Sequence, residues 1–292
     1  MKRLLEYIIE SKEITTLNNE QRKQELEKWL KNKKYDDYVD TLNKMLKDPK
    51  AKTLLVDGFG GDLGDTKLKF SVQEIPAINL IPTQNEIDLD KSILHALKRK
   101  TSFISTFNKP VIILKPVITF RKNYIIDGHH SWLQTIALNP NGKLLCFNYD
   151  GDISPIQMLK VVQGTIAAVQ AETNKKQLPS NDTDGPNIFD DKFEKEDMIK
   201  YIEDNFNEEL LNVYKEYLKL NNLNEIKSFL VEQLLNVRNN NYPILNAPDR
   251  IDMPQTFKGG TNLNDKNTAQ PDFKGSALNK LKDDKFYKTT IK

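Results

Sequence analysis

The sequence contains one cysteine and three histidines among its 292 residues. The single cysteine, Cys146, excludes an internal disulfide framework and any zinc site built from several cysteines. It lies in the apolar run 144–147, so we expect a small buried side chain there and not a reactive thiol. Low cysteine content is also typical of a protein from a reducing compartment.

The sequence also lacks a long apolar run and an excess of charge of one sign. We find no stretch of about 18 uncharged apolar residues, and we therefore expect no membrane-spanning helix. Lys and Arg number 43 and Asp and Glu number 41, which gives a net charge of +2. No overall basic field therefore indicates nucleic-acid binding. The hydrophobic fraction of 38% lies below the globular average, which indicates a folded centre flanked by polar segments.

Changes in composition and hydrophobic spacing divide the chain into regions. Tyr35, Tyr38 and Leu42 follow helical spacing, whereas β-branched runs at 110–114 and 117–120 are typical of strands. The pattern predicts, in order, a helical N-terminal arm (1–50), an α/β domain (51–175), a linker (176–187), a helical hairpin (188–240) and a polar, locally basic tail (241–292). The predicted fold class is therefore mixed α/β.

Within the α/β domain, strand and helix signals alternate. We predict an extended segment over 75–81 and further strands over 124–126 and 144–149. Asp88 is expected to cap one helix, and Ser154 followed by proline is expected to start another. A third helix is predicted over 131–137.

The densest group of chemically useful residues lies where the strand at 124–126 meets the helix at 131–137. Gly128 allows the backbone to turn sharply there, and the first amides of the helix point outward. A helix start of this kind attracts anions. We therefore predict that the turn at 126–132 binds phosphate, with Gly128 and Ser131 among the binding residues.

The side chains of this turn suggest specific roles. His130 is the candidate for proton transfer, His129 is the candidate phosphate donor, and Asp127 would orient an imidazole or bind Mg²⁺. Gln84 and Glu86 are expected to reach the same cleft. The alternative is that one of the adjacent histidines only packs and that Asp127 only forms the turn.

Three segments carry a resemblance to a known family: 79–87, 109–113 and 124–132, the last of which contains Asp-Gly-His-His-Ser-Trp. Together they resemble the ParB/sulfiredoxin-like fold, in particular the ParB-like domains of tailed-bacteriophage proteins, over about residues 67–175. The resemblance implies that Gly128 matches the family glycine. It also implies that His129 takes the place of the sulfiredoxin cysteine and that His130 matches the histidine after it.

Two departures from the family pattern bear on activity. Because no cysteine stands at position 129, sulfiredoxin chemistry is excluded. Ser131 occupies the position where the family usually has arginine, which removes a bidentate phosphate donor but leaves a hydroxyl.

Two functions remain open. The first is a phage ParB-like protein that binds a nucleotide or a nucleic-acid backbone at 126–132, with nuclease or nucleotidase activity as its enzymatic form. The alternative is a non-catalytic virion structural or assembly protein, in which the ParB-like domain is a scaffold and the arms and tail bind protein partners. Either function implies a location in the host cytoplasm or in the virion.

Overall fold

The computed structural model describes residues 69–100, 103, 111–156, 158, 159, 162 and 185–248. The expected N-terminal arm, most of the expected linker and the tail beyond residue 248 lie outside the described residues. Within them the predicted mixed α/β class is confirmed. The elements are β1 (Lys69–Pro76), η1 (Ala77–Asn79), β2 (Ile81–Pro82), η2 (Asp90–Leu94), α5 (His95–Lys98), β3 (Val111–Phe120), β4 (Tyr124–Asp127), α7 (His129–Leu138), β5 (Lys143–Asp150), α9 (Lys195–Asn205), η3 (Glu208–Leu210), α10 (Leu211–Leu218) and α11 (Leu223–Asn240).

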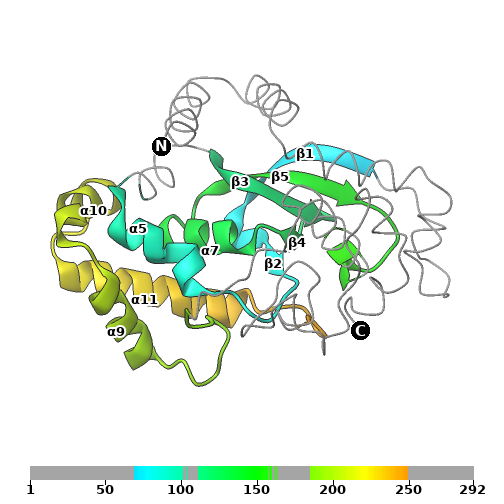
Figure 1. Cartoon of the computed structure of the whole chain (residues 1–292). Helices are drawn as coiled ribbons and strands as arrows, with labels where there is room; N and C mark the ends of the chain where they lie inside the picture. Colours follow the sequence, from blue (N-terminus) through cyan, green and yellow to red (C-terminus); the bar gives the residue numbers. More distant parts are fainter. Residues whose placement is uncertain are drawn as a thin grey trace, which may run out of the picture.

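The five strands form one mixed sheet in the order β1-β5-β3-β4-β2. The pairs β3–β5 and β2–β4 are parallel, and the other two pairs are antiparallel. Helix α7 packs on β3, α11 packs on α7, and α9 packs on α11, so these three labelled helices in Figure 1 form layers on one side of the sheet. Among the described residues no helix is long and apolar enough to cross a membrane.

Strand β3 joins the two runs that the sequence separates at Lys115 and Pro116. The strand is continuous, but its register against β5 shifts between Ile112 and Val117. Proline has no N–H to donate to the ladder, so the pairing is interrupted there while the strand continues.

The extended segment predicted over 75–81 is confirmed at its two ends and wrong in its middle, at Ala77–Asn79. Strand β1 ends at Pro76, and the 3₁₀ turn η1 follows before β2 begins. Tertiary contacts hold this turn, because the Trp132 indole donates to the Ala77 carbonyl (2.8 Å) and the Ala77 amide donates to the Gly142 carbonyl (2.9 Å). Local sequence spacing carries no information about such partners.

One apolar core includes residues of the sheet, of α7 and of the C-terminal helices, among them Ile125, Trp132 and Leu230. Cys146 is fully buried as predicted, and burial raises the pKa of its thiol well above the usual value. Its thiolate is therefore not available as a nucleophile.

The region 188–240 contains α9 in addition to the two helices of the predicted hairpin. The first of these corresponds to η3 and α10, and the second corresponds to α11. Helix α9 begins with a capping box between Glu194 and Asp197. Our prediction did not include it, because glutamate is not a usual N-cap residue. The last residues of the expected linker, 185–187, are packed, since the Leu89 amide donates to the Pro186 carbonyl (3.0 Å).

The β3–β4 hairpin turns through two residues in the left-handed region, Arg121 (φ 50°) and Lys122 (φ 63°). The fully buried Asn148 supports this turn, because its Oδ1 accepts from the Lys122 amide (2.6 Å) and from Thr119 Oγ1 (3.2 Å). The buried side-chain amide of Asn148, on the neighbouring strand, thus stabilises a left-handed backbone conformation that costs free energy in any residue with a Cβ.

Lys122→Gly is expected to raise the free energy of unfolding by roughly 0.5–1 kcal/mol, because glycine adopts a positive φ without strain. Urea denaturation measures the change. The control is Lys215→Gly inside α10, which should lower the free energy of unfolding by about 1 kcal/mol. Destabilisation by both substitutions would show that strain at this turn is negligible.

Candidate functional site

The centre of the candidate site is Gly128, between β4 and α7. Its φ is +97°, and a Cβ added to it would lie 3.0 Å from Val117 Cγ2 and 3.1 Å from Val117 Cα. Both the backbone angle and the close approach of β3 therefore require glycine here.

The N-cap residue of helix α7 is this glycine, which has no side chain with which to cap the helix. Its first helical hydrogen bond runs from the Trp132 amide to the Gly128 carbonyl (3.0 Å). The amides of residues 129–131 precede that bond and form the positive end of the helix dipole. A helix of ten residues that begins this way is suited to binding an anion.

Strand β2 brings a second group of predicted residues to the same edge of the sheet. It runs parallel to β4, with Ile81 opposite Tyr124 and Pro82 opposite Ile125. The segment 83–86, which we call the site loop, therefore leaves the sheet beside the β4–α7 turn. Ligands of α/β proteins commonly bind outside the carboxyl ends of strands.

His129 contacts the site loop and is only 2% exposed. Its Nε2 accepts a hydrogen bond from the Thr83 amide (3.2 Å). A ring nitrogen that accepts carries no hydrogen, so Nε2 of His129 cannot also donate to a phosphate. This side chain connects the end of β2 to the start of α7, and the predicted donation from His129 to phosphate would have to come from Nδ1.

His130 and Ser131 are both partly exposed on the first turn of α7. They differ in this respect from His129, although the three residues are consecutive. Of the predicted side chains on the helix, these two are the ones a ligand from solvent can reach. An imidazole and a hydroxyl at this position can both donate hydrogen bonds to phosphate oxygens.

The other predicted residues are less accessible. Asp127 is 6% exposed and Gln84 is 4% exposed. The side-chain Nε2 of Gln84 donates to the Glu86 backbone carbonyl (2.6 Å), so Gln84 stabilises the conformation of the site loop. Glu86 is partly exposed, but its negative charge disfavours contact with phosphate and suits a hydroxyl group such as that of ribose.

The predicted Mg²⁺ ligand Asp127 is not part of a larger cluster of metal-binding side chains in the described residues. Within the described ranges no group of three or more His, Cys, Asp or Glu side chains is arranged to hold a metal ion. Because Mg²⁺ is commonly held by one or two carboxylates and water, the Mg²⁺ role of Asp127 stays a prediction.

Sequence reasoning missed Thr83 and Asn187, which hold the site loop at its two ends. Thr83 acts through its backbone amide, a group present in nearly every residue. Asn187 Oδ1 accepts from the Ile87 amide (2.9 Å), and its Nδ2 donates to the Asn85 carbonyl (3.2 Å). In the sequence, Asn187 is only an asparagine at the end of the predicted linker, and nothing near it indicates a contact with the site loop.

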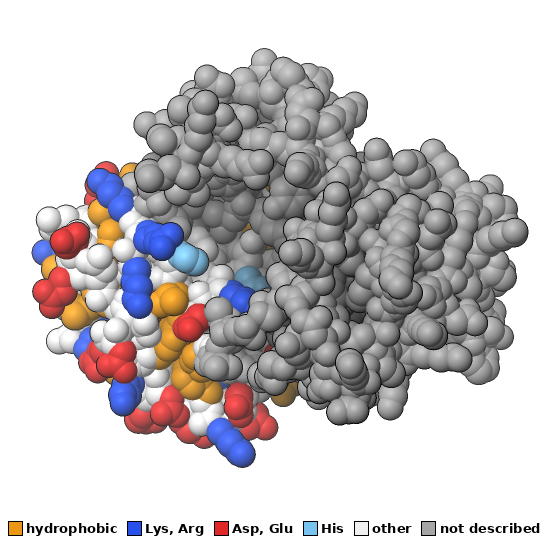
Figure 2. All heavy atoms as spheres, in the orientation of Figure 1, with side chains coloured by type: hydrophobic (Ala, Val, Ile, Leu, Met, Phe, Trp, Pro, Cys, Tyr) orange, Lys and Arg blue, Asp and Glu red, His pale blue; other side chains and the backbone are white. Residues whose placement is uncertain are grey.

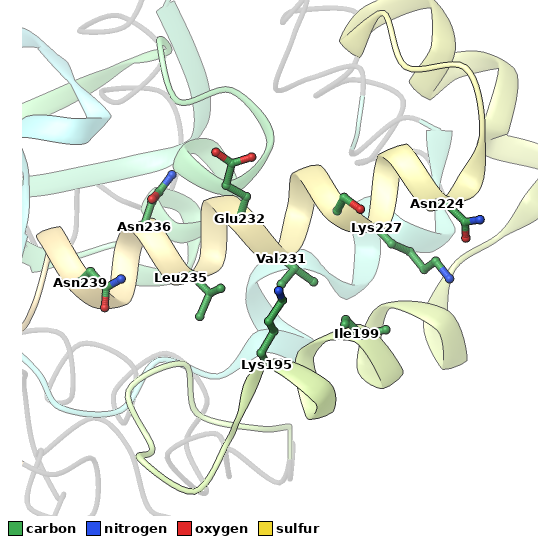
Figure 3. Close-up of a pocket in the computed structure, with 10 residues that line it drawn as sticks. Lys195, Ile199, Asn224, Lys227, Val231, Glu232, Leu235, Asn236 and Asn239 are labelled. Carbon is green, nitrogen blue, oxygen red and sulfur yellow. The ribbon is translucent and has the colours of Figure 1, made fainter.

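A separate groove of about 690 Å³ lies between α9 and α11 (Figure 3). It has apolar side chains from Ile199, Val231 and Leu235 and a largely polar rim that includes Asn236 and Asn239. Lys227 on this rim forms an ion pair with Glu203 (2.6 Å). None of the residues predicted from the sequence lines the groove.

The charges on the described part of the surface are mixed. On the face shown in Figure 2, Lys and Arg side chains alternate with Asp and Glu, and small apolar patches lie between them. This face shows no broad field of one sign among the described residues, in keeping with the net charge of +2.

Comparison with protein-family models, curated proteins and solved structures gives no match for this chain.

Proposed function

We propose that this protein binds a phosphate-bearing ligand, a nucleotide or the backbone of a nucleic acid, at the turn 126–132. One observation carries the proposal: Gly128, at φ +97°, turns the chain into the start of helix α7 beside the carboxyl end of the parallel strand β2. The helix amides would bind the phosphate oxygens, with His130 and Ser131 as additional donors. Membership of the phage ParB-like proteins, in the host cytoplasm or the virion, is part of this proposal.

Hydrolysis of the bound ligand would require more than a phosphate-binding turn. A nuclease or nucleotidase needs a group that transfers a proton to or from the reacting atoms. Of the three expected catalytic residues, His130 is the one with partial exposure, while Asp127 and His129 are buried. His130 would therefore be the proton-transfer residue in any hydrolytic activity.

The first test uses the charge at position 131. Ser131→Glu adds a negative charge to the first turn of α7, which favours the helix by roughly 0.3–1 kcal/mol but repels phosphate. We expect this variant to keep its thermal stability and to bind ATP at least tenfold more weakly. Ser131→Arg should bind ATP more tightly, because guanidinium pairs with phosphate. Isothermal titration calorimetry with ATP and with short DNA measures both.

Ser131→Gln is the matched control, since it has nearly the shape of glutamate without its charge. It should bind ATP within about threefold of the wild-type protein, a difference below 1 kcal/mol. Equal affinities for the Glu, Gln and Arg variants would exclude this helix start as the phosphate site. Absence of both ATP and DNA binding by the wild-type protein would refute the proposed function as a whole.

The second candidate function is a non-catalytic assembly protein. It is favoured by the exposed large apolar side chains of Ile78 (55%), Tyr242 (56%) and Leu245 (88%). A contiguous group of such side chains is typical of surfaces that bind other proteins, and Ile78 lies near the segment of Tyr242 because Asn241 Nδ2 donates to the Ile78 carbonyl (3.0 Å). Chemical crosslinking of purified virions tests this candidate: a crosslink from 241–248 to a capsid or tail protein supports it, and absence of the protein from the particle argues against it.

A further inference from the structure

The segment 241–248, which we call the strap, follows α11 and runs alongside β2. Asn241 Nδ2 donates to the carbonyls of Ile78 and Leu80 (3.0 Å each). The Ile244 amide donates to the Pro82 carbonyl (3.1 Å). These contacts advance in the same direction along both segments, so the strap extends from the start of β2 towards the site loop.

The strap meets the site loop at Asn85. The Asn85 amide donates to the Pro248 carbonyl (3.1 Å), and Asn85 Nδ2 donates to the Ala247 carbonyl (2.7 Å). On its other side, the Asn85 carbonyl accepts from Asn187 (3.2 Å). A single residue of the loop is thus held by two segments that lie more than a hundred positions away in the sequence.

These contacts complete the attachment of the site loop. At its first residue, the Thr83 amide donates to His129 at the start of α7. In its middle, Asn85 binds the strap. Just beyond it, the Ile87 amide donates to Asn187. The loop therefore lies against the phosphate-binding turn in a fixed conformation, although only two residues of β2 pair with the sheet.

We propose that the strap is a positioning element of the phosphate site and that Asn85 is the residue through which it acts. The inference rests on the proposed function. A loop that is already ordered costs a ligand less conformational entropy on binding, so detaching the strap should weaken binding without removing any group that touches phosphate. By thermodynamic linkage, a bound ligand stabilises the docked strap by the same factor.

The experiment compares full-length wild-type protein with Asn85→Ala, which removes the side-chain bond to Ala247. The ATP dissociation constant is measured by calorimetry, and amide hydrogen exchange is measured by mass spectrometry for peptides covering 83–86 and 241–248. We expect Asn85→Ala to weaken ATP binding about tenfold. In the wild-type protein ATP should slow exchange of the strap, and in the variant this protection should be lost.

Two further variants make the result specific. Asn241→Ala removes the bonds to Ile78 and Leu80 at the far end of the strap, and it should also reduce ATP-dependent protection; it serves in place of Asn85→Ala if that variant does not fold. Asn236→Ala, on the exposed rim of the α9–α11 groove, is the matched control and should behave as wild type.

The outcomes separate the two proposals. The strap inference is overturned if wild-type protein binds ATP but ATP leaves the hydrogen exchange of 241–248 unchanged. It is also overturned if Asn85→Ala and Asn241→Ala bind ATP with wild-type affinity. In both cases the proposed function stands. If wild-type protein binds neither ATP nor DNA, the proposed function fails and the inference fails with it.

Discussion

Gly128→Ala is expected to lower the free energy of unfolding by about 3 kcal/mol and to abolish ATP binding. Two costs combine. A left-handed conformation costs a residue with a Cβ roughly 1–2 kcal/mol, and forcing an extra carbon into a packed site costs roughly 1–3 kcal/mol. The new Cβ would meet the Cα of Val117, which belongs to the central strand β3 and cannot move as a side chain can. Relief therefore requires a shift of the turn, which displaces the start of α7.

Urea denaturation and calorimetry with ATP measure the two effects. Gly151→Ala is the control, because Gly151 does not have a positive φ and lies beyond β5. It should change the free energy of unfolding by less than about 1 kcal/mol. A Gly128→Ala variant of wild-type stability would show that the turn can adopt another conformation, and the argument for a rigid anion site would fail.

The parts of the fold that the sequence predicts well are those with local causes. The β-branched run before Asp127 forms β4, and the run 144–149 lies within β5. Asp88 accepts from the Lys91 amide (3.1 Å), as expected for a helix cap. In each case the signal and the structure lie within a few residues of each other.

The errors arise where distant partners decide the outcome. Local spacing favours a strand through Ala77, but the Trp132 indole binds its carbonyl from 55 positions away. The site loop presents a similar case, because Asn85 and Asn187 are ordinary loop residues by composition. Their contacts depend on how α11 and its continuation pack, and that packing is a property of the whole core.

The candidate site shows the same division between local and distant causes. The glycine turn and the helix start were predictable from the order of Asp127, Gly128 and the residues that follow. The different environments of His129 and His130 were not predictable from the sequence, because they depend on the backbone amide of Thr83, which follows β2. Residue type alone gives His129 and His130 the same chemistry, whereas burial and the Thr83 contact distinguish them.

Substitutions at His129 test this distinction. His129→Leu leaves the Thr83 amide buried without its acceptor and should lower the free energy of unfolding by about 2–3 kcal/mol. His129→Gln places a carbonyl oxygen near the position of Nε2 and should cost about 1 kcal/mol or less. Thermal and urea denaturation measure both changes. A smaller loss in the glutamine variant identifies the bond to Thr83 as the main contribution of the imidazole.

The same glutamine substitution separates structure from ligand contact. Because Nε2 of His129 accepts a hydrogen bond in the folded protein, His129→Gln should bind ATP within about threefold of wild type. His130→Gln replaces the partly exposed imidazole and should bind ATP about tenfold more weakly at unchanged stability. Equal loss of ATP affinity in the two variants would identify His129 as a phosphate donor, acting through Nδ1 while Nε2 accepts from Thr83.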